Sequence, residues 1–468
     1  MGKPRDTGST SFRKVLISAD PFEETPSQNH WMTRGRWPAT WIAPPDISPP
    51  FVAAFRCRFE FDEAKTFRIH VTADERYELF CNGHRVGRGP ERCDTYHWSF
   101  DTYDVSLPAG HHVIVARTWA LGDLAPYAQI SVSPGFLLCP EEPELRPHLA
   151  TGAAPWEVKV LDGYSYKSPM SSFGVGHRFR IDGTNFPWDF YLGKGQGWRQ
   201  PKQKEAGFSE KTRNELAPGQ HLLVPARLPA MLEVPWTKAK VRHISAPKDG
   251  YTSRLPVIET EDLTDEHEPW QRLLDAKAPI DIPPHTRRRV LLDLTDYICC
   301  YPELVVRGGA GARIRIHFQE ALYEDLARWS KGHRDDIAGN YFAMGIAGRD
   351  GLGDSWTLPS TSDGSDMGAT ARGPSAAPPS QQDGVPKRLD TLWWLAGRYV
   401  ELLVETADEP LTIESLVFYE TGYPLEASNA LRQIAVRTPV ERPSSTQNDS
   451  RLTSSDQYGE LLRELTEI

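Results

Sequence analysis

The chain has 468 residues, with 53 Lys or Arg and 63 Asp or Glu, so its formal net charge is −10. Such a length predicts two to four domains, and an acidic chain without a basic block is a poor match for nucleic acid or an anionic membrane surface. No apolar run approaches the roughly 20 residues of a membrane-spanning helix. The first residues lack the apolar stretch of a secretion signal, which predicts a cytoplasmic protein.

A polar lead-in at residues 1–35 is followed by a predicted β-sandwich at residues 36–140. Residues 51–61 alternate apolar and polar side chains, as a half-buried strand does. Tyr77, Leu79 and Cys81 repeat this alternation until Asn82-Gly83, a pair typical of a two-residue hairpin turn. Further strands are expected at residues 113–119 and 128–132. Turn signals recur about every 8–12 residues, which is the spacing of a sandwich.

Residues 141–285 are less regular and predict an irregular β and linker region. Short strands are expected near residues 156–158 and 179–181, and a short helix at 269–276. Residues 182–198, DGTNFPWDFYLGKGQGW, combine glycines, aspartates and aromatic rings, which is the composition of a loop.

A second β-sandwich is predicted at residues 286–425. Its strands are expected at 289–294, 304–307, 313–318, 399–405 and 411–419, with Gly308 to Gly311 joining two of them as a hairpin. Residues 356–390 are rich in Ser, Pro, Gly, Ala and Asp, and predict a disordered insertion. Residues 426–468 form a polar tail. The predicted fold class is therefore mainly β, with two jelly-roll-like antiparallel sandwiches.

The six cysteines are sparse and irregularly spaced, so we expect reduced and mostly buried thiols. Cys299 and Cys300 are adjacent in an expected strand, so their side chains should point to opposite faces. The sequence has no C-x-x-C, H-E-x-x-H or G-x-G-x-x-G pattern, and we expect neither a metal nor another cofactor.

Two loops combine charged groups with aromatic rings, the side chains that bind sugars. Charged groups bond sugar hydroxyls, and rings cover the apolar face of a pyranose. The alternative interpretation is that these loops pack against a neighbouring domain. The predicted carbohydrate-binding residues are Glu91, Arg92, Asp94, Trp98, Trp119, Trp188, Asp189 and Trp198.

Several stretches together resemble the bacterial α-L-rhamnosidase family of inverting glycoside hydrolases. In the second expected sandwich they are Val305-Val306-Arg307-Gly308-Gly309, Glu320-Ala321-Leu322-Tyr323, Lys331-Gly332-His333-Arg334-Asp335, Gly397-Arg398-Tyr399 and Tyr423-Pro424-Leu425. In the first they are Asn82-Gly83, Val86-Gly87-Arg88-Gly89-Pro90 and Asp101-Thr102-Tyr103-Asp104. His333 departs from the Asn of the family's Lys-Gly-Asn-Arg-Asp-like loop. The matches keep their order over roughly residues 36–425.

This resemblance implies accessory β-sandwiches that precede an (α/α)6 barrel, which carries the acid and base carboxylates in that family. The chain stops about where such a barrel would begin, so no catalytic residue is carried over. We therefore expect a truncated, non-catalytic, carbohydrate-binding portion of a rhamnosidase-like hydrolase. Its expected partners are rhamnose-containing glycans and a separate catalytic barrel. The alternatives are an active α-L-rhamnosidase and a ligand-free scaffold.

The carboxylates themselves point to no acid–base pair. Asp182 and Asp189 share one loop, and Glu91 and Asp94 share another, but nearness in sequence does not place two carboxylates on opposite sides of a sugar. Glu320 follows an expected strand, and its predicted role is a structural partner of an arginine or a backbone group.

Overall fold

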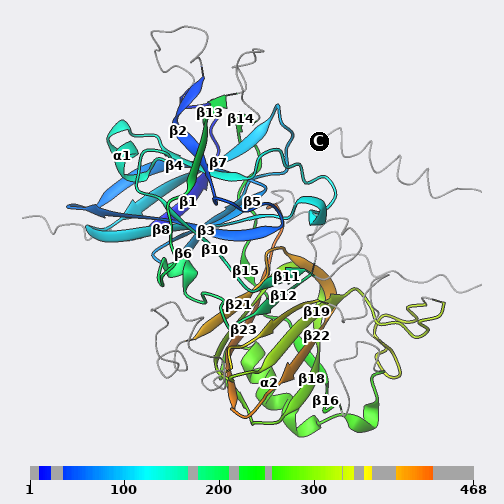
Figure 1. Ribbon diagram of the computed structural model, residues 1–468. Coiled ribbons are helices and arrows are strands. Elements are labelled where there is room, and N and C mark those ends of the chain that lie inside the picture. The colour runs from blue at the N-terminus through cyan, green and yellow to red at the C-terminus, as the bar shows by residue number, and fades with distance from the viewer. Residues whose placement is uncertain are drawn as a thin grey trace, which may run out of the picture. The chain divides into compact units, whose positions relative to one another are not determined.

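The computed structural model describes residues 10–22, 35–166, 178–209, 221–247, 256–328, 330–341, 353–360 and 386–424. Strands dominate these residues, and most neighbouring strands are antiparallel, which confirms the predicted mainly β fold (Figure 1). The described residues up to Tyr423 belong to one compact unit. No helix within these described ranges is long and apolar enough to cross a membrane.

The first sandwich contains two sheets, drawn mainly in blue and cyan in Figure 1. The seven-stranded sheet contains, in spatial order, β1 (Ser11–Val15), β7 (Trp98–Leu107), β14 (Leu222–Pro225), β13 (Lys202–Ser209), β2 (Arg36–Ala43), β9 (Gly135–Pro140) and β4 (Lys65–Asp74). The five-stranded sheet contains β10 (Glu157–Val160), β3 (Phe51–Phe61), β8 (Gly110–Ala120), β5 (Arg76–Cys81) and β6 (His84–Gly89).

Alternating side chains give the five-stranded sheet two buried faces. Tyr77, Leu79 and Cys81 of β5 join the core between the two sheets, as the period-2 pattern predicts. Phe80 points the other way and joins a second core that it shares with the second sandwich. This sheet is therefore covered on both sides, and its outer face is the one that meets the rest of the chain.

The predicted hairpin at Asn82-Gly83 is confirmed. Cys81 pairs with His84 in the antiparallel ladder of β5 and β6. Asn82 has φ 51° and Gly83 has φ 84°, the two positive angles that a tight primed turn requires. The Asn82 side chain also accepts a hydrogen bond from the Val113 backbone N–H at 2.9 Å, which ties the turn to β8.

The second sandwich is built from one sheet of eleven strands. Its main path contains β11 (Tyr164–Tyr166), β12 (Phe179–Asp182), β20 (Asp354–Thr357), β19 (Arg313–Gln319), β22 (Leu395–Glu405), β18 (Arg287–Gly308), β23 (Leu411–Glu420) and β15 (Val234–Pro235). Off this path, β16 (Lys240–Ser245) and β21 (Lys387–Asp390) pair with β18, and β17 (Ile280–Ile282) pairs with β23.

The long strand β18 folds this sheet around its core. Its first half pairs with β16 and β22, and its second half pairs with β21 and β23. Val290 and Leu292 from the first half and Leu304 and Val306 from the second half belong to the same buried cluster. Cys300 lies in that cluster while Cys299 is only half-buried, so the two thiols occupy opposite faces as expected.

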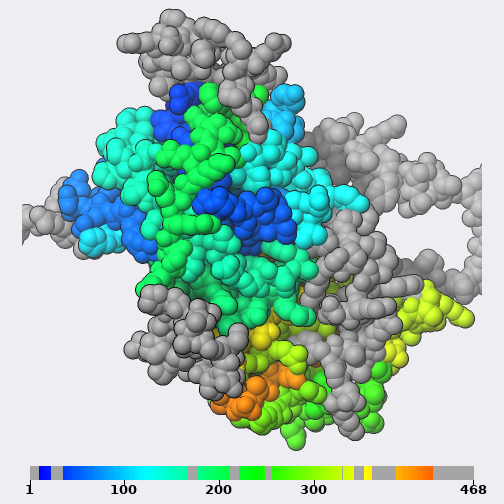
Figure 2. Space-filling view, in the orientation of Figure 1, coloured from blue at the N-terminus to red at the C-terminus, as the bar shows by residue number. Residues whose placement is uncertain are grey.

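Among the residues that the structure describes, helices are few and short. The α-helices are α1 (Arg146–Leu149) and α2 (His267–Leu274), and α2 lies close to the helix expected at 269–276. The 3-10 turns are η1 (Gly122–Leu124), η2 (Pro143–Leu145), η3 (Phe190–Leu192), η5 (Glu259–Glu261) and η6 (Thr264–Glu266). Figure 2 shows green residues, which include β13 and β14, lying among the blue and cyan residues of the first sandwich on the face in view.

Several segments differ from expectation. The lead-in contributes β1, which pairs with β7, and the region expected to be irregular or a linker contributes β13 and β14 to the first sandwich and β16 and β17 to the second. The prediction of a strand at residues 128–132 is wrong, because the next strand is β9. The hairpin predicted at Gly308–Gly311 is also wrong, because β19 pairs with β20 and β22 and not with β18.

The low-complexity stretch lies mostly outside the described residues. Its first residues belong to β20 and its last to β21, so strands extend further into it than predicted. Residues 361–385 and the tail from residue 425 onward, including the leucines of the polar tail, lie outside the described ranges.

Gly397 tests how closely β19 and β22 pack. A Cβ atom at Gly397 would lie 2.8 Å from the backbone nitrogen and oxygen of Gln319. We expect Gly397→Ala to lower the free energy of unfolding by roughly 1–3 kcal/mol, because a rigid backbone cannot yield to an added methyl group. Gly422→Ala is the control, since nothing lies within 4 Å of its Cβ position. Urea unfolding measures both, and equal effects would contradict the close approach.

Candidate functional site

Two of the residues predicted to bind sugar lie in the hydrophobic cores. Trp98 in β7 is 1% exposed, and its ring packs edge-on against His221 with centroids 4.4 Å apart. Trp119 in β8 is 2% exposed and meets Trp393 of the second sandwich at 5.9 Å. Their ring faces contact protein, so both tryptophans stabilise the fold in this structure.

Glu91 and Arg92 lie in the loop between β6 and β7. The Glu91 carboxylate accepts a hydrogen bond from the backbone N–H of Leu228 at 2.7 Å, so it fixes a second loop beside its own. Arg92 is exposed and donates to the Tyr127 carbonyl at 3.2 Å, while its guanidinium lies 5.9 Å from the Trp393 ring centroid. Arg92 thus lies at the border between the loops and the second sandwich.

Asp94 shapes the same loop. It is exposed, and its carboxylate accepts hydrogen bonds from the backbone N–H groups of Tyr96 at 2.7 Å and His97 at 2.9 Å. The His97 side chain lies 3.1 Å from the same carboxylate, and this hydrogen bond lowers the pKa of Asp94. Tyr96 is 61% exposed, and Tyr127 across the Arg92 contact is 55% exposed. Arg92, Asp94, Tyr96 and Tyr127 therefore form one exposed patch, called here the loop surface.

Trp188, Asp189 and Trp198 lie in the long loop over the outer face of the five-stranded sheet. Trp188 is half-buried and donates from Nε1 to the Gly183 carbonyl at 3.3 Å. Asp189 precedes η3. Trp198 donates to the Lys194 carbonyl at 2.9 Å, and the Arg56 guanidinium lies 4.3 Å from its ring centroid. The sequence analysis likewise assigned these residues to a second loop, distinct from the loop that carries Glu91 to Trp98.

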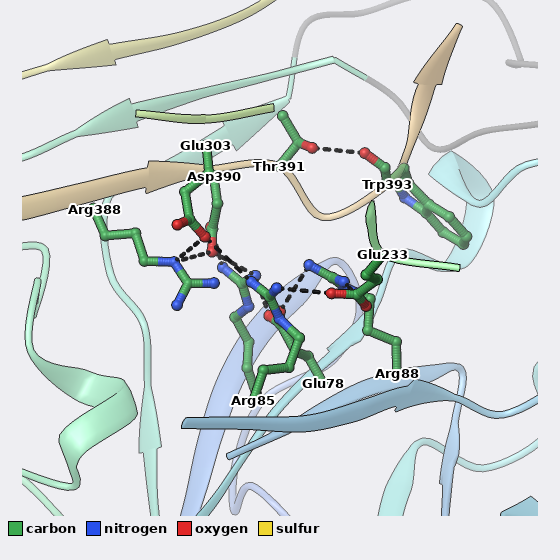
Figure 3. A network of polar contacts seen from close by, with 10 residues as sticks. Glu78, Arg85, Arg88, Glu233, Glu303, Arg388, Asp390, Thr391 and Trp393 are labelled. Atoms are coloured by element: carbon green, nitrogen blue, oxygen red, sulfur yellow. Dashed lines mark hydrogen bonds and ion pairs between the residues drawn. The ribbon is translucent and has the colours of Figure 1, made fainter. Parts of the chain in front are cut away.

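Beside this loop, a buried network of charges joins the two sandwiches. At its centre Glu78 of β5 is fully buried and accepts from Arg85 at 2.5 Å, from Arg88 at 3.1 Å and from Arg117. Burial alone would raise the pKa of Glu78, but the three guanidinium charges outweigh it and hold the pKa well below its ordinary value. Figure 3 shows Glu78 with Arg85 and Arg88 from the first sandwich at the centre of these contacts.

The second sandwich supplies the other half of the network. Asp390 of β21 accepts from Arg117 at 2.7 Å and lies 3.3 Å from Arg388. Glu303 of β18 lies 2.9 Å from Arg388 and 3.4 Å from Arg85. Glu233, on the segment before β15, pairs with Arg85 at 3.0 Å and also with Arg88. The network thus contains four arginines and four acidic side chains, and each of these side chains has at least one partner of opposite type.

Glu303 is the member of this network whose protonation changes near neutral pH. Burial raises its pKa to about 7, although the charge of Arg85 acts in the opposite direction. Arg388 also passes between aromatic rings, with its guanidinium 5.6 Å from Phe80 and 5.7 Å from Tyr191. The strand β21 is therefore held by both ion pairs and cation–π contacts.

Two cavities in the described residues differ in size and in lining. One of about 10 Å³ is lined by rings that include Trp188 and Tyr191, together with Arg388 and Asp390, and it holds one water molecule at most. An open groove of about 440 Å³ lies between Ala246–Pro247 and His285–Arg288. The carboxylate in that groove, Glu405, is paired with Arg287 at 2.8 Å and Arg313 at 2.6 Å.

Glu320 is paired with an arginine, as the sequence analysis expected, and also with a lysine. Its carboxylate pairs with Lys331 at 2.8 Å and Arg334 at 2.5 Å, and these bonds lower its pKa. Within the part of the chain that the structure describes, no group of three or more His, Cys, Asp or Glu side chains is placed to hold a metal ion.

Sequence reasoning missed the residues that join the sandwiches. Glu78 lies between inward-facing residues of a strand, a position that ordinarily faces water. Tyr127 and Trp393 lie in turns without a motif, and only the folded chain brings them to Arg92. The high tryptophan content suggested that aromatic rings bind sugar, but composition does not distinguish tryptophans in the core from exposed ones.

Comparison with known proteins finds similarity to solved structures alone, which concerns the fold of this chain. No family model matches the chain, and no curated protein does. Among solved structures, the GH78 family rhamnosidase of Bacillus sp. GL1 is 14% identical with a TM-score of 0.57, covering 83% of this chain and 56% of that one. The α-L-rhamnosidase from Aspergillus terreus is 15% identical with a TM-score of 0.46, covering 83% and 36%. A Pleurotus ostreatus lectin is 10% identical with a TM-score of 0.25, covering 89% and 85%.

Of these three, the Bacillus enzyme alone has a TM-score above 0.5, and it shows the fold. The described β-sandwiches share the fold of part of a GH78 rhamnosidase, as the resemblance predicted. The chain spans about half of that enzyme, with 56% of its length covered.

Arg117 tests the buried network. We expect Arg117→Met to lower the free energy of unfolding by about 3–5 kcal/mol, because it leaves Glu78 and Asp390 buried without their shared partner. Arg13→Met is the matched control. Arg13 also pairs with an aspartate, at 2.8 Å, but its side chain is 76% exposed, so its loss should cost less than about 1 kcal/mol. Equal losses in urea unfolding would show that the network adds no stability.

Glu303 gives a pH dependence. With a folded pKa of about 7 and an ordinary value of 4.5, this carboxyl keeps its proton in the folded state while the unfolded state ionises. The stability that protonated Glu303 adds to the folded state is therefore fully present below about pH 4.5 and is lost as the pH rises through 7. Glu303→Gln stays neutral, so the fall in Tm between pH 5 and pH 8 should be smaller than in the wild type. An unchanged fall would mean that Glu303 is ionised throughout.

Proposed function

We propose that this chain is the non-catalytic β-sandwich portion of an α-L-rhamnosidase-like glycoside hydrolase, and that it binds rhamnose-containing carbohydrate without cleaving it. The observation that carries the proposal is the shared fold, which covers 83% of this chain and 56% of the Bacillus GH78 rhamnosidase. A separate catalytic barrel is the partner that this function implies. The buried charge network suits such a role, because it fixes the two sandwiches as one platform.

The carboxylates of the described residues support a non-catalytic role. Glycoside hydrolysis needs two carboxylates about 5–9.5 Å apart on either side of the scissile bond. The open groove beside Arg287 offers Glu405, which two arginines already hold. Burial raises the pKa of Glu75 to about 7, a value that suits a general acid, but Glu75 is fully buried and accepts bonds from the Leu121 and Gly122 N–H groups at 2.9 Å. Glu75 cannot reach a substrate from that position.

The loop surface is the proposed sugar-binding site. Tyr96 is 61% exposed and Tyr127 is 55% exposed, and tyrosine rings suit the C–H face of a pyranose. Arg92 and Asp94 lie at the same place and supply a donor and an acceptor for hydroxyl groups. Glu91 supports the site through its bond to the Leu228 N–H and does not contact the sugar itself.

The second loop is a proposed extension for a longer glycan. Trp188 and Trp198 are half-buried, so each keeps part of its ring accessible, and Asp189 lies between them in the chain. Trp98 and Trp119 are buried in the cores, so we propose that they stabilise the strands and do not contact the sugar.

Titration calorimetry with an α-L-rhamnoside tests the proposal. We expect saturable binding by the wild type, and less bound ligand per chain when Arg92, Tyr96 and Tyr127 are all changed to Ala. The control is Ile258→Ala, which removes an exposed apolar side chain elsewhere and should leave binding unchanged. Absence of binding by the wild type would remove the proposed function.

An assay with an aryl α-L-rhamnoside tests the non-catalytic part. We expect release of the aryl alcohol to stay at the level of the protein-free blank. Release that disappears when a single Asp or Glu is replaced would show that the chain is itself a rhamnosidase.

A further inference from the structure

Three stretches that resemble the rhamnosidase family separately come together on the second sandwich. They are 320–323 after β19, 331–335 in the excursion between β19 and β20, and 397–399 in β22. Arg398 reaches the Asp335 carboxylate at 2.6 Å, and Tyr399 donates to the Arg334 carbonyl at 2.7 Å. The excursion is thus tied to β22 at two successive residues.

A buried carboxylate anchors this connection. Asp293 of β18 has a side chain only 4% exposed and receives Arg398 at 2.9 Å and Arg242 at 2.8 Å. Burial would raise the pKa of Asp293, but the bond from Arg398 and the charge of Arg242 lower it, so the group stays ionised. Arg242 also donates to the Asp335 carbonyl at 3.2 Å. A buried charge therefore fixes the backbone of a surface loop.

The fixed loop holds three partly exposed charged groups in one array. Glu320 accepts from Lys331 through one oxygen and from Arg334 through the other, at 2.8 and 2.5 Å. Side-chain exposures are 35% for Glu320, 36% for Lys331 and 60% for Arg334. Exposed pairs of this kind add little stability, about 0–1 kcal/mol each. They retain donors and acceptors that point to solvent, which is what sugar hydroxyls need.

An aromatic ring lies beside this array. The register of β18 against β22 shifts between Asp293 and Ile298, and Tyr297 in this irregular stretch is 57% exposed. Ile298 pairs with Gly397 of β22, and a Cβ atom at Gly397 would lie 2.8 Å from the Gln319 backbone, so Tyr297 and Glu320 lie on either side of the same stretch of β22. Burial raises the pKa of Tyr297, and the Glu320 charge acts in the same direction. The Lys331 ammonium also lies 5.8 Å from the Tyr323 ring centroid. Ring faces and fixed polar groups thus meet at one exposed place.

We propose that Tyr297, Glu320, Lys331 and Arg334 form a second carbohydrate-binding site, on the second sandwich, for a neutral pyranose. The Tyr297 ring covers the apolar face of the sugar, Glu320 accepts from two neighbouring hydroxyls, and Lys331 and Arg334 donate to ring or hydroxyl oxygens. The ligand class rests on the proposed function, but the residues are distinct from the loop surface.

Photoaffinity labelling of the full chain tests this site separately from the loop surface. A diazirine-bearing α-L-rhamnoside is cross-linked and the labelled peptides are identified by mass spectrometry. We expect label on peptides containing Tyr297 and residues 331–334, reduced about tenfold in Tyr297→Ala, which corresponds to a loss of about 1.4 kcal/mol. Tyr127→Ala is the matched control: it should reduce label on the loop surface and leave the Tyr297 peptide unchanged.

The outcomes separate the two proposals. Label confined to the loop surface would overturn the second site and leave the proposed function standing. Label confined to the Tyr297 and 331–334 peptides would support the second site and contradict the loop surface. Arg398→Lys gives an independent readout. It weakens the contacts of Arg398 with Asp335 and Asp293, so labelling at residues 331–334 should fall while the Tyr297 side chain itself is unchanged. Equal labelling of wild type and Tyr297→Ala at those peptides would show non-specific attachment and overturn the site.

Discussion

The buried ion network around Glu78 is the interaction on which the arrangement of this chain depends. Glu78 is fully enclosed, and without Arg85, Arg88 and Arg117 its charge would be too costly to bury. Arg117 also pairs with Asp390, so the network joins the outer face of the five-stranded sheet to the second sandwich. A neighbour joined by apolar contacts alone could slide, whereas paired charges specify one position.

This constraint also bears on where the proposed sugar sites lie. The outer face of the five-stranded sheet is occupied by the network, by Arg388 between its rings and by the loop that carries Trp188. The most exposed of the tyrosines discussed above lie instead at the loop surface, on the first sandwich, and at Tyr297, on the second. On a rigid platform the two proposed sugar sites would keep a fixed spacing, which would favour extended or branched glycans.

The local part of this structure was predictable from sequence, and the long-range part was not. Alternation in β5 and the Asn82-Gly83 turn depend on neighbouring residues, so pattern alone identified them. The Arg117–Asp390 bond joins residues 273 positions apart, and no pattern indicates such a pair. The hairpin expected at Gly308 was wrong for the same reason. The glycines indicate a turn, but they do not show that β19, the strand after the turn, pairs with β22 and not with β18. At the candidate site, composition identified loops with rings and charges. It could not show that Trp98 is core while Tyr127 is exposed, because burial is a property of the whole fold.

Differential scanning calorimetry of the full chain at neutral pH and low salt tests the central claim most directly. If the buried charges join the two sandwiches into one cooperative unit, the described β-structure unfolds in one transition whose calorimetric and van't Hoff enthalpies agree. Two separate transitions, each with its own midpoint, would contradict the account and show that the sandwiches are independent domains.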